Sequence, residues 1–245
     1  MRCRYRERIY KTGDYLEVKI YPVFANVRGR RRTKFRPTSE VQARLNEYNS
    51  RRHLARIINE NFSSKDIWIH PTFRDDALPK SDEECLRIFQ NFIRRLKRVY
   101  EKRGVELKYV GVCEQSEVGR YHLHIIINTL LTPDELRDVW KLGRVMSEAL
   151  DFNEFGVAGL ANYMTKFRLL TRRYLRSRNL RDPKPVTNDR RYSQRDVNAL
   201  RTSADLASEF QKQYPGYRFA ECKPFFNDVN TYWYVSVFMY RPQRK

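Results

Sequence analysis

The segment Tyr121-His-Leu-His-Ile-Ile-Ile-Asn128 has the pattern of a half-buried β-strand. Side chains alternate between the two faces of a β-strand, so His122, His124 and Ile126 are expected on one face. The opposite face, expected in a hydrophobic core, carries Leu123, Ile125 and Ile127. The chain has only four histidines, and two of them lie here. Two neutral imidazoles about 7 Å apart can bind one divalent metal ion, although a structural role is the alternative for such a pair.

A second strand is expected over residues 106–115, joined to the histidine strand by a tight turn. The length of the loop decides which side chain faces His122, because directly paired residues share a face of an antiparallel sheet. A three-residue loop pairs Glu114 with His122, whereas a two-residue loop pairs Gln115 with it. The expected third metal ligand is therefore Glu114, with Gln115 as the alternative.

Further along the chain, residues 160–167 predict a helix with a candidate nucleophile. Leu160, Met164 and Phe167 recur at helical spacing and form an apolar stripe. Tyr163 and Lys166 are three residues apart, which makes them neighbours on the surface of a helix. The alternative for Tyr163 is a core aromatic that joins the stripe.

The composition of the 245-residue chain points to a polyanionic partner. Its formal net charge is +20 and its pI is near 10.0, and a surplus of this size favours nucleic acid over a merely soluble basic protein. Hydrophobic residues make up 41% of the chain, which is enough for a core. The length allows one large domain or a catalytic domain with an appendage.

Several protein classes are disfavoured by the sequence. No apolar run approaches the length of a membrane span, and the first residues have no apolar segment typical of a secretory signal. No Walker A glycine loop is present, so any DNA unwinding requires another protein. The cysteines are scattered, which suits reduced thiols in a cytosol and not a zinc finger; they are Cys3, Cys85, Cys113 and Cys222.

Two segments are densely basic. Residues 28–36 carry six basic side chains in nine, and residues 166–191 carry ten against two aspartates. Tyr174 lies within the second segment and Tyr192 directly follows it, which suits single-stranded nucleic acid, whereas a disordered linker is the alternative. The residues expected to contact DNA are Arg30, Arg31, Arg32, Arg168, Arg172, Arg173, Arg176 and Arg178.

Hydrophobic periodicity and capping residues predict the remaining elements. Helices are expected over residues 39–60, 82–102, 132–141 and 196–213, and strands over residues 15–24, 144–150 and 231–240. Ser81 is expected to cap the second helix and Gly104 to follow its end. Tyr232, Trp233 and Tyr234 are expected mainly in a sheet core, with base contacts as the minor alternative.

The order of these motifs resembles the HUH endonucleases, the rolling-circle replication initiators of small phages and plasmids. Ile67-Trp-Ile-His-Pro-Thr-Phe73 looks like the first motif of that family, with His70 and Pro71 replacing two usual residues, so this strand is expected to end early or bend. Ser177-Arg-Asn-Leu180 and Pro183 are similar to phage and plasmid replication proteins of bacteria. The resemblance covers roughly residues 10–185.

The resemblance implies an α+β fold. A ferredoxin-like antiparallel sheet of four to five strands would carry the histidine strand near its centre. Helices would pack on one face, and the metal site would lie on the other, open face. A nicking endonuclease domain with a basic N-terminal arm is expected over residues 1–190, and residues 191–245 are expected as an extension packed on it.

The resemblance also implies an activity, namely nicking and rejoining single-stranded DNA at a replication origin. Mg²⁺ or Mn²⁺ would be held by His122, His124 and Glu114. Tyr163 would form a 5′-phosphotyrosine intermediate, and Lys166 would lower the pKa of the phenol or bind phosphate. The implied partners are single-stranded DNA or an origin hairpin, together with a host helicase and polymerase, in a bacterial cytoplasm without membrane contact.

Two alternatives remain open at this point. One is a single-tyrosine transposase or relaxase, although relaxase signatures usually cluster three histidines and this sequence places only two together. The other is a non-catalytic DNA-binding replication or repressor protein, which metal-dependent cleavage of an oligonucleotide would exclude.

Overall fold

A computed structural model describes residues 3–24, 40–116, 118–164, 174–203, 205–227 and 230–242. The chain divides into two compact units. The central unit comprises Ser50–Phe152 and Val157–Arg181. The terminal unit comprises Met1–Asn49, Asn153–Gly156 and Asp182–Lys245.

The central unit contains a five-stranded antiparallel sheet with the histidine strand in the middle. Its strands are, in spatial order, β6 (Val145–Ala149), β3 (Ile67–Pro71), β5 (Tyr121–Ile127), β4 (Tyr109–Gln115) and β7 (Leu175–Arg176). Every neighbouring pair is antiparallel. The expected α+β class and the central position of the histidine strand are therefore confirmed.

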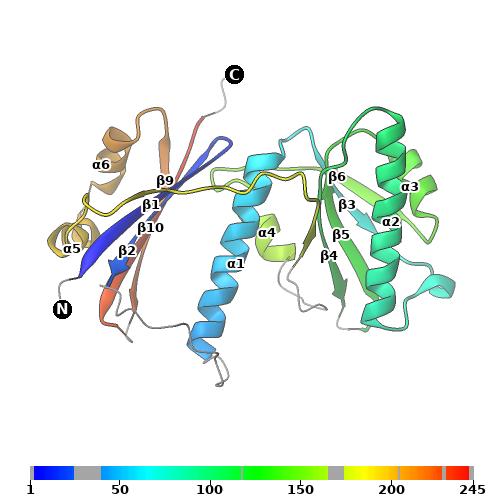
Figure 1. Ribbon diagram of the computed structural model, residues 1–245, viewed down its shortest axis with the longest axis horizontal. Helices are drawn as coiled ribbons and strands as arrows, with labels where there is room; N and C mark the ends of the chain where they lie inside the picture. The colour runs from blue at the N-terminus through cyan, green and yellow to red at the C-terminus, as the bar shows by residue number, and fades with distance from the viewer. Residues whose placement is uncertain are drawn as a thin grey trace. The chain divides into compact units, whose positions relative to one another are not determined.

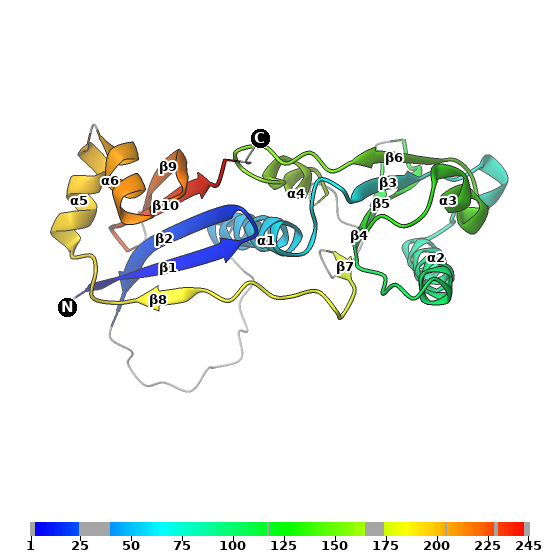
Figure 2. The ribbon, with the colours of Figure 1, turned by 90° about the horizontal axis from the view of Figure 1, so that it is seen from above.

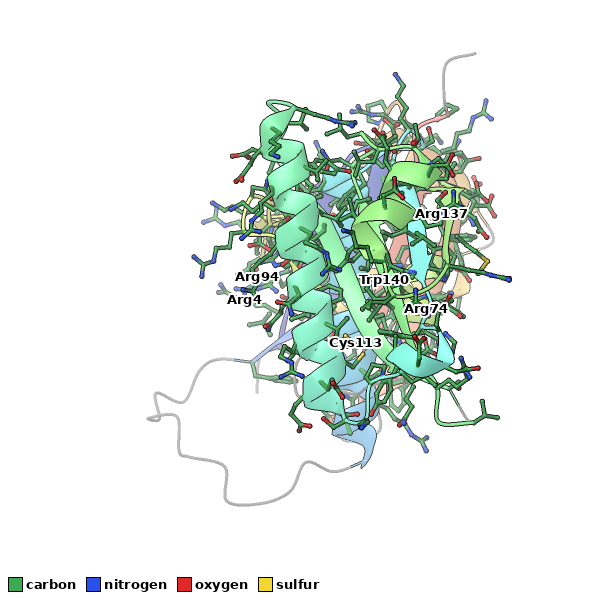
Figure 3. All side chains as sticks on the ribbon, turned by 90° about the vertical axis from the view of Figure 1, so that its right-hand side faces the viewer. Arg4, Arg74, Arg94, Cys113, Arg137 and Trp140 are labelled. Carbon is green, nitrogen blue, oxygen red and sulfur yellow. The ribbon has the colours of Figure 1, made fainter. Side chains whose placement is uncertain are left out.

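One face of this sheet packs against α2 (Asp82–Lys102) and α3 (Pro133–Trp140), which lie in front of the strands in Figure 3. As the alternation in β5 predicts, Leu123, Ile125 and Ile127 point into this core. Trp140 is fully buried, and its indole Nε1 donates a hydrogen bond of 2.7 Å to the Thr72 carbonyl. That bond satisfies the one polar atom of a large apolar side chain, so its burial stabilises the unit.

The expected caps of α2 are confirmed. The Ser81 side chain accepts a hydrogen bond from the Glu84 amide, which satisfies an otherwise unpaired donor at the start of α2. Gly104, just beyond the end of α2, has a φ of 71°, a conformation that glycine adopts without strain. Thr132 and Glu135 form a complete capping box at the start of α3.

The opposite face is not open along its whole length, contrary to the expectation. Val110, Val112 and Ile126 pack against the C-terminal half of α1 (Glu40–Asn61) and against α4 (Ala158–Met164). Figure 1 shows these helices on the other side of the sheet from α2 and α3. The reason is the apolar character of one end of this face, which requires cover, whereas the end that carries Glu114 and the histidines is polar.

The first-motif strand ends where the sequence suggested. β3 stops at Pro71, and an isolated bridge between Thr72 and His122 follows it. A short 3₁₀ helix, η1 (Asp75–Ala77), then leads into α2. Pro71 lacks the amide that a continuing ladder requires, which accounts for the early end.

The terminal unit holds a second five-stranded antiparallel sheet, which the sequence did not predict. Its strands are, in spatial order, β8 (Val186–Asn188), β1 (Arg4–Thr12), β2 (Tyr15–Val23), β10 (Tyr232–Tyr240) and β9 (Arg218–Asn227). Figure 2 shows α5 (Gln194–Thr202) and α6 (Leu206–Gln213) together on one face. Val18, Val237 and Phe210 are fully buried in the core between these helices and the sheet.

One expectation differs from the structure of this unit. The single helix expected over residues 196–213 is two helices, because Ser203 takes an extended conformation at the end of α5. Within this unit, β2, near the start of the chain, pairs with β10, near its end.

Candidate functional site

The β4–β5 register brings Glu114 directly opposite His122, on the face shared with His124. The Ser116 amide donates a hydrogen bond of 2.8 Å to the Arg120 carbonyl and so closes the turn. Gln115 pairs with Tyr121 instead. The register is therefore the one that a three-residue loop requires, and Gln115 points away from the histidines.

Glu114 and His124 are in direct contact at the polar end of this face. The Nε2 atom of His124 lies 3.0 Å from Oε2 of Glu114, and both side chains are buried. Burial, together with the neighbouring His70 and His122, lowers the pKa of His124 to about 3. Burial also lowers the pKa of His122, and the positive charge of Arg120 lowers it further. Both imidazoles are therefore neutral near pH 7, which is the form that binds metals.

The structure adds His70 and Trp68, which the sequence argument did not assign to the site. The His70 and His124 rings lie 4.7 Å apart between centroids, and the Trp68 and His70 rings lie 3.8 Å apart. Burial lowers the pKa of His70 as well. Alternation along β3 could have found both residues, because Ile67 and Ile69 pack in the core and leave Trp68 and His70 on the site face.

Tyr163 reaches this cluster from α4. Its ring lies 5.2 Å from the His124 ring and 5.7 Å from the Trp68 ring, in edge-to-face geometry. Ala161 and Met164 are buried and fix the helix against the sheet, whereas Tyr163 is 45% exposed. Burial and then the negative charge of Glu114 raise the pKa of the phenol. Tyr163 is thus anchored beside the histidines and accessible to a ligand, which a core aromatic would not be.

The contact between His124 and Glu114 tests the fit of these residues to a divalent ion. Adjacent ligands of an octahedral ion with bonds of about 2.1 Å lie about 3 Å apart, close to the separation of His124 Nε2 and Glu114 Oε2. The buried Nδ1 of the same ring has no hydrogen-bond partner among the described residues, and an ion bound at Nε2 would not supply one. Across the same residues, however, no three His, Cys, Asp or Glu side chains already form a metal-binding group.

A cavity of about 350 Å³ adjoins His122. Arginines from three segments line it beside His122, namely Arg74, Arg120 and Arg144. Arg74 forms an ion pair with Asp76, and Arg120 with Asp75, which positions both guanidinium groups. The cavity is therefore cationic next to a candidate metal site, which suits a phosphate group.

The expected DNA contacts lie only partly within the described residues. Arg176 is in β7 and pairs with Val110, so it belongs to the site face of the sheet. Arg178 follows it and is exposed. The expected contacts that lie outside the described residues are Arg30, Arg31, Arg32, Lys166, Arg168, Arg172 and Arg173.

Histidines, a carboxylate and an accessible tyrosine on one face of an antiparallel sheet are a composition typical of metal-assisted phosphoryl transfer. A family model described as a replication-associated protein, of the ORF2 and gene II protein type, matches residues 66–168, from the start of β3 to just beyond α4. This match supports a replication-initiator family and a role in DNA replication. Comparison with curated proteins and with solved structures gave no match. None of the helices in the described ranges has the length and apolar character needed to cross a membrane.

Proposed function

We propose that the chain is a replication initiator that nicks and rejoins single-stranded DNA through Tyr163. The observation that carries this proposal is the contact of Tyr163 with His124, which itself contacts Glu114. All three residues lie within the segment matched by the replication-associated family model. Apolar side chains would stabilise this position better than a buried imidazole–carboxylate pair does. The presence of the pair beside an accessible phenol therefore favours a functional role.

The chemical step is a transesterification. The phenolic oxygen of Tyr163 attacks phosphorus and loses its proton, and the bond from phosphorus to the 3′ oxygen breaks. The departing oxygen takes a proton and becomes a 3′-hydroxyl that a polymerase can extend. The 5′-phosphate stays on Tyr163 as a phosphodiester. A 3′-hydroxyl can reverse the reaction, so the DNA can be rejoined without an external energy source.

His122, His124 and Glu114 would hold a divalent ion, for which two imidazoles and one carboxylate suit Mn²⁺ or Mg²⁺. When bound, such an ion polarises the scissile phosphate and offsets the Glu114 charge that raises the pKa of Tyr163. Lys166, three residues after Tyr163 in the sequence, would lower the same pKa or bind phosphate.

The arginine-lined cavity would position the DNA strand. Arg120 and Arg144 lie beside His122, at the end of the site opposite the apolar cover. A phosphate next to the scissile one would be held there by charge-assisted hydrogen bonds. Such contacts fix orientation and carry no sequence information by themselves.

The test is direct detection of the covalent intermediate. The protein is incubated with Mn²⁺ and a library of labelled single-stranded fragments of the replicon that encodes it, and adducts are resolved on a denaturing gel. Mass spectrometry of the digested adduct is expected to find the nucleotide on Tyr163. An adduct mapped to another residue, or none with any fragment, would contradict the proposal.

A relaxase is a second candidate, favoured by the position of His70. The contact of His70 with His124 supplies the third clustered histidine that the local sequence motif lacks. Nicking confined to a transfer origin would support the relaxase, whereas nicking at the replication origin would support the initiator.

A further inference from the structure

A row of aromatic side chains crosses three neighbouring strands of the terminal unit. Tyr234 on β10 pairs directly with Phe225 on β9. The pairing of Val235 with Ile20 makes Tyr21 on β2 the other neighbour of Tyr234. The Tyr21 and Tyr234 rings are stacked with centroids 6.5 Å apart and an interplanar angle of 8°, and Phe225 lies 6.2 Å from Tyr234. We call these three residues the aromatic row.

The aromatic row lies on the face that α5 and α6 leave uncovered. Ile20 and Val235, one residue away on their strands, point into the core beneath these helices, so Tyr21 and Tyr234 point the other way. Phe225 is 53% exposed, and Tyr21 and Tyr234 are partly exposed. The Tyr234 hydroxyl accepts a hydrogen bond of 2.7 Å from Asn230, which fixes its ring.

Basic side chains border the aromatic row on the same face. Arg6 pairs with Tyr21 across β1 and β2, and the Arg8 guanidinium lies 5.8 Å from the centre of the Tyr21 ring. The next row across the sheet contains Arg8, Lys19, Ser236 and Lys223. Acidic partners offset much of this charge, because Asp189 pairs with Arg6, Glu17 with Lys19 and Glu221 with Lys223. α1 borders this surface at Lys19, which contacts Tyr48 and Asn49.

We propose that this face binds single-stranded DNA, with bases on the aromatic row and phosphates on the adjacent basic residues. Exposed rings provide stacking surfaces for unpaired bases, and flanking cations track the backbone. The charge complementarity favours a polyanion over an apolar protein partner, and a duplex would keep its bases stacked inside and unavailable to the rings. This surface takes no part in the cleavage chemistry, so the inference holds even if Tyr163 is not a nucleophile.

The chain contains a matched control for its test. Phe225 and Phe226 are adjacent and both exposed, but Phe226 contacts Trp233 and lies on the opposite face of β9. Affinity for a long thymidine oligonucleotide is measured by fluorescence anisotropy, without divalent metal. Phe225→Ala is expected to weaken binding about tenfold, and Phe226→Ala to leave it unchanged.

Two further measurements separate the contribution of base stacking from that of phosphate contacts. An abasic oligonucleotide keeps its phosphates, so Phe225→Ala should bind it like the native protein. Lys223→Ala should weaken binding to both oligonucleotides and make the slope of log affinity against log salt shallower by about 0.7. Phe225→Leu keeps an apolar side chain and removes the ring, so it should behave as Phe225→Ala and serves if the alanine variant is unstable.

Equal affinities of the native protein and the Phe225→Ala and Phe225→Leu variants would overturn the inference. An equal loss of affinity in Phe226→Ala would also overturn it, because the effect would then not depend on the face of β9 that carries the ring. Adduct formation on a short oligonucleotide that covers only the cut site should be unaffected by Phe225→Ala. Failure of this inference therefore leaves the Tyr163 chemistry standing, and the reverse is also true.

Discussion

His124 combines burial with polar neighbours, and that combination defines its chemistry. It is only 5% exposed, touches Glu114 through one nitrogen and has no described partner for the other. A buried imidazole between His70 and Glu114 is costly to keep without a ligand. Because the fold nevertheless holds it there, we infer that His124 serves binding or catalysis and not stability.

The pKa of His124 predicts how the metal-free protein responds to acid. Its pKa is lowered from 6.5 to about 3 in the folded chain, so between these values the unfolded chain binds a proton that the folded chain resists. Stability should therefore fall as the pH drops from about 6.5 towards 3. In EDTA, the His124→Gln variant should show a shallower fall of Tm over this range. Parallel curves for the two proteins would contradict the assignment.

Substitution of the expected ligands should separate cleavage from DNA binding. His122→Ala, His124→Ala and Glu114→Ala should each abolish Mn²⁺ binding in calorimetry and DNA cleavage, and EDTA should do the same to the native protein. Affinity for single-stranded DNA should change little, because it comes mainly from phosphate contacts. Gln115→Ala is the control, since that side chain points to the turn and donates to the Gly119 carbonyl. Full cleavage in EDTA would end the metal hypothesis.

At the scale of elements, the loop between α3 and β6 is held against the end of β3. The Thr72 amide donates to the Arg144 carbonyl and the Arg74 amide to the Leu142 carbonyl, each at 2.8 Å. This close approach requires Gly143, because a Cβ there would lie 2.2 Å from the Thr72 carbonyl oxygen. The loop thereby positions Arg144 beside the arginine-lined cavity.

Gly143→Ala should therefore destabilise the protein by about 1–3 kcal/mol, since backbone must move to admit the methyl group. Gly159→Ala in α4 is the matched control. Nothing lies within 4 Å of its added Cβ, and alanine in a helix is more favourable than glycine by about 0.5–1 kcal/mol. Urea unfolding measures both. A neutral Gly143→Ala variant would show that the close approach is not required.

Local sequence patterns predicted the elements that carry the site, because each has a strong local cause. Alternation in β5, the capping box of α3 and the Ser81 cap of α2 all depend on neighbours in sequence. β1 and β9 could not be found in this way. Arg4, Arg6 and Arg8 alternate along β1 as on a solvated segment, and only pairing with β2, stabilised by burial of Tyr5, makes it a strand. The position of His70 beside His124 likewise depends on the β3–β5 register.

At the scale of the whole chain, the net charge of +20 favours a polyanion, but composition cannot say which residues make contact. The pairing of β2 with β10 brings residues from opposite ends of the sequence into one sheet, and no local pattern encodes it. That pairing also creates the face that carries the aromatic row and the basic residues beside it. Tyr234 was expected mainly in a core, and its partial exposure beside Phe225 follows from the register of β9 and β10.

The basic segment after Tyr163 predicts a salt dependence. Simultaneous replacement of Arg172, Arg173 and Arg176 by alanine should make the slope of log affinity against log salt shallower by about 2, since each phosphate contact contributes about 0.7. Binding to all sequences should weaken similarly. Affinities of single-stranded oligonucleotides measured over a range of salt concentrations provide the check. An unchanged slope would remove this segment from the DNA path.

The Tyr163→Phe substitution shows whether Tyr163 is the nucleophile. It removes one hydroxyl from a half-exposed ring and keeps the contacts with Trp68 and His124, so the fold should survive. The native protein, Tyr163→Phe and the control Tyr174→Phe are incubated with Mn²⁺ and a labelled single-stranded origin fragment, then run on a denaturing gel. We predict a covalent adduct with the native protein and with Tyr174→Phe, and none with Tyr163→Phe. A labelled adduct that persists in Tyr163→Phe would contradict the account.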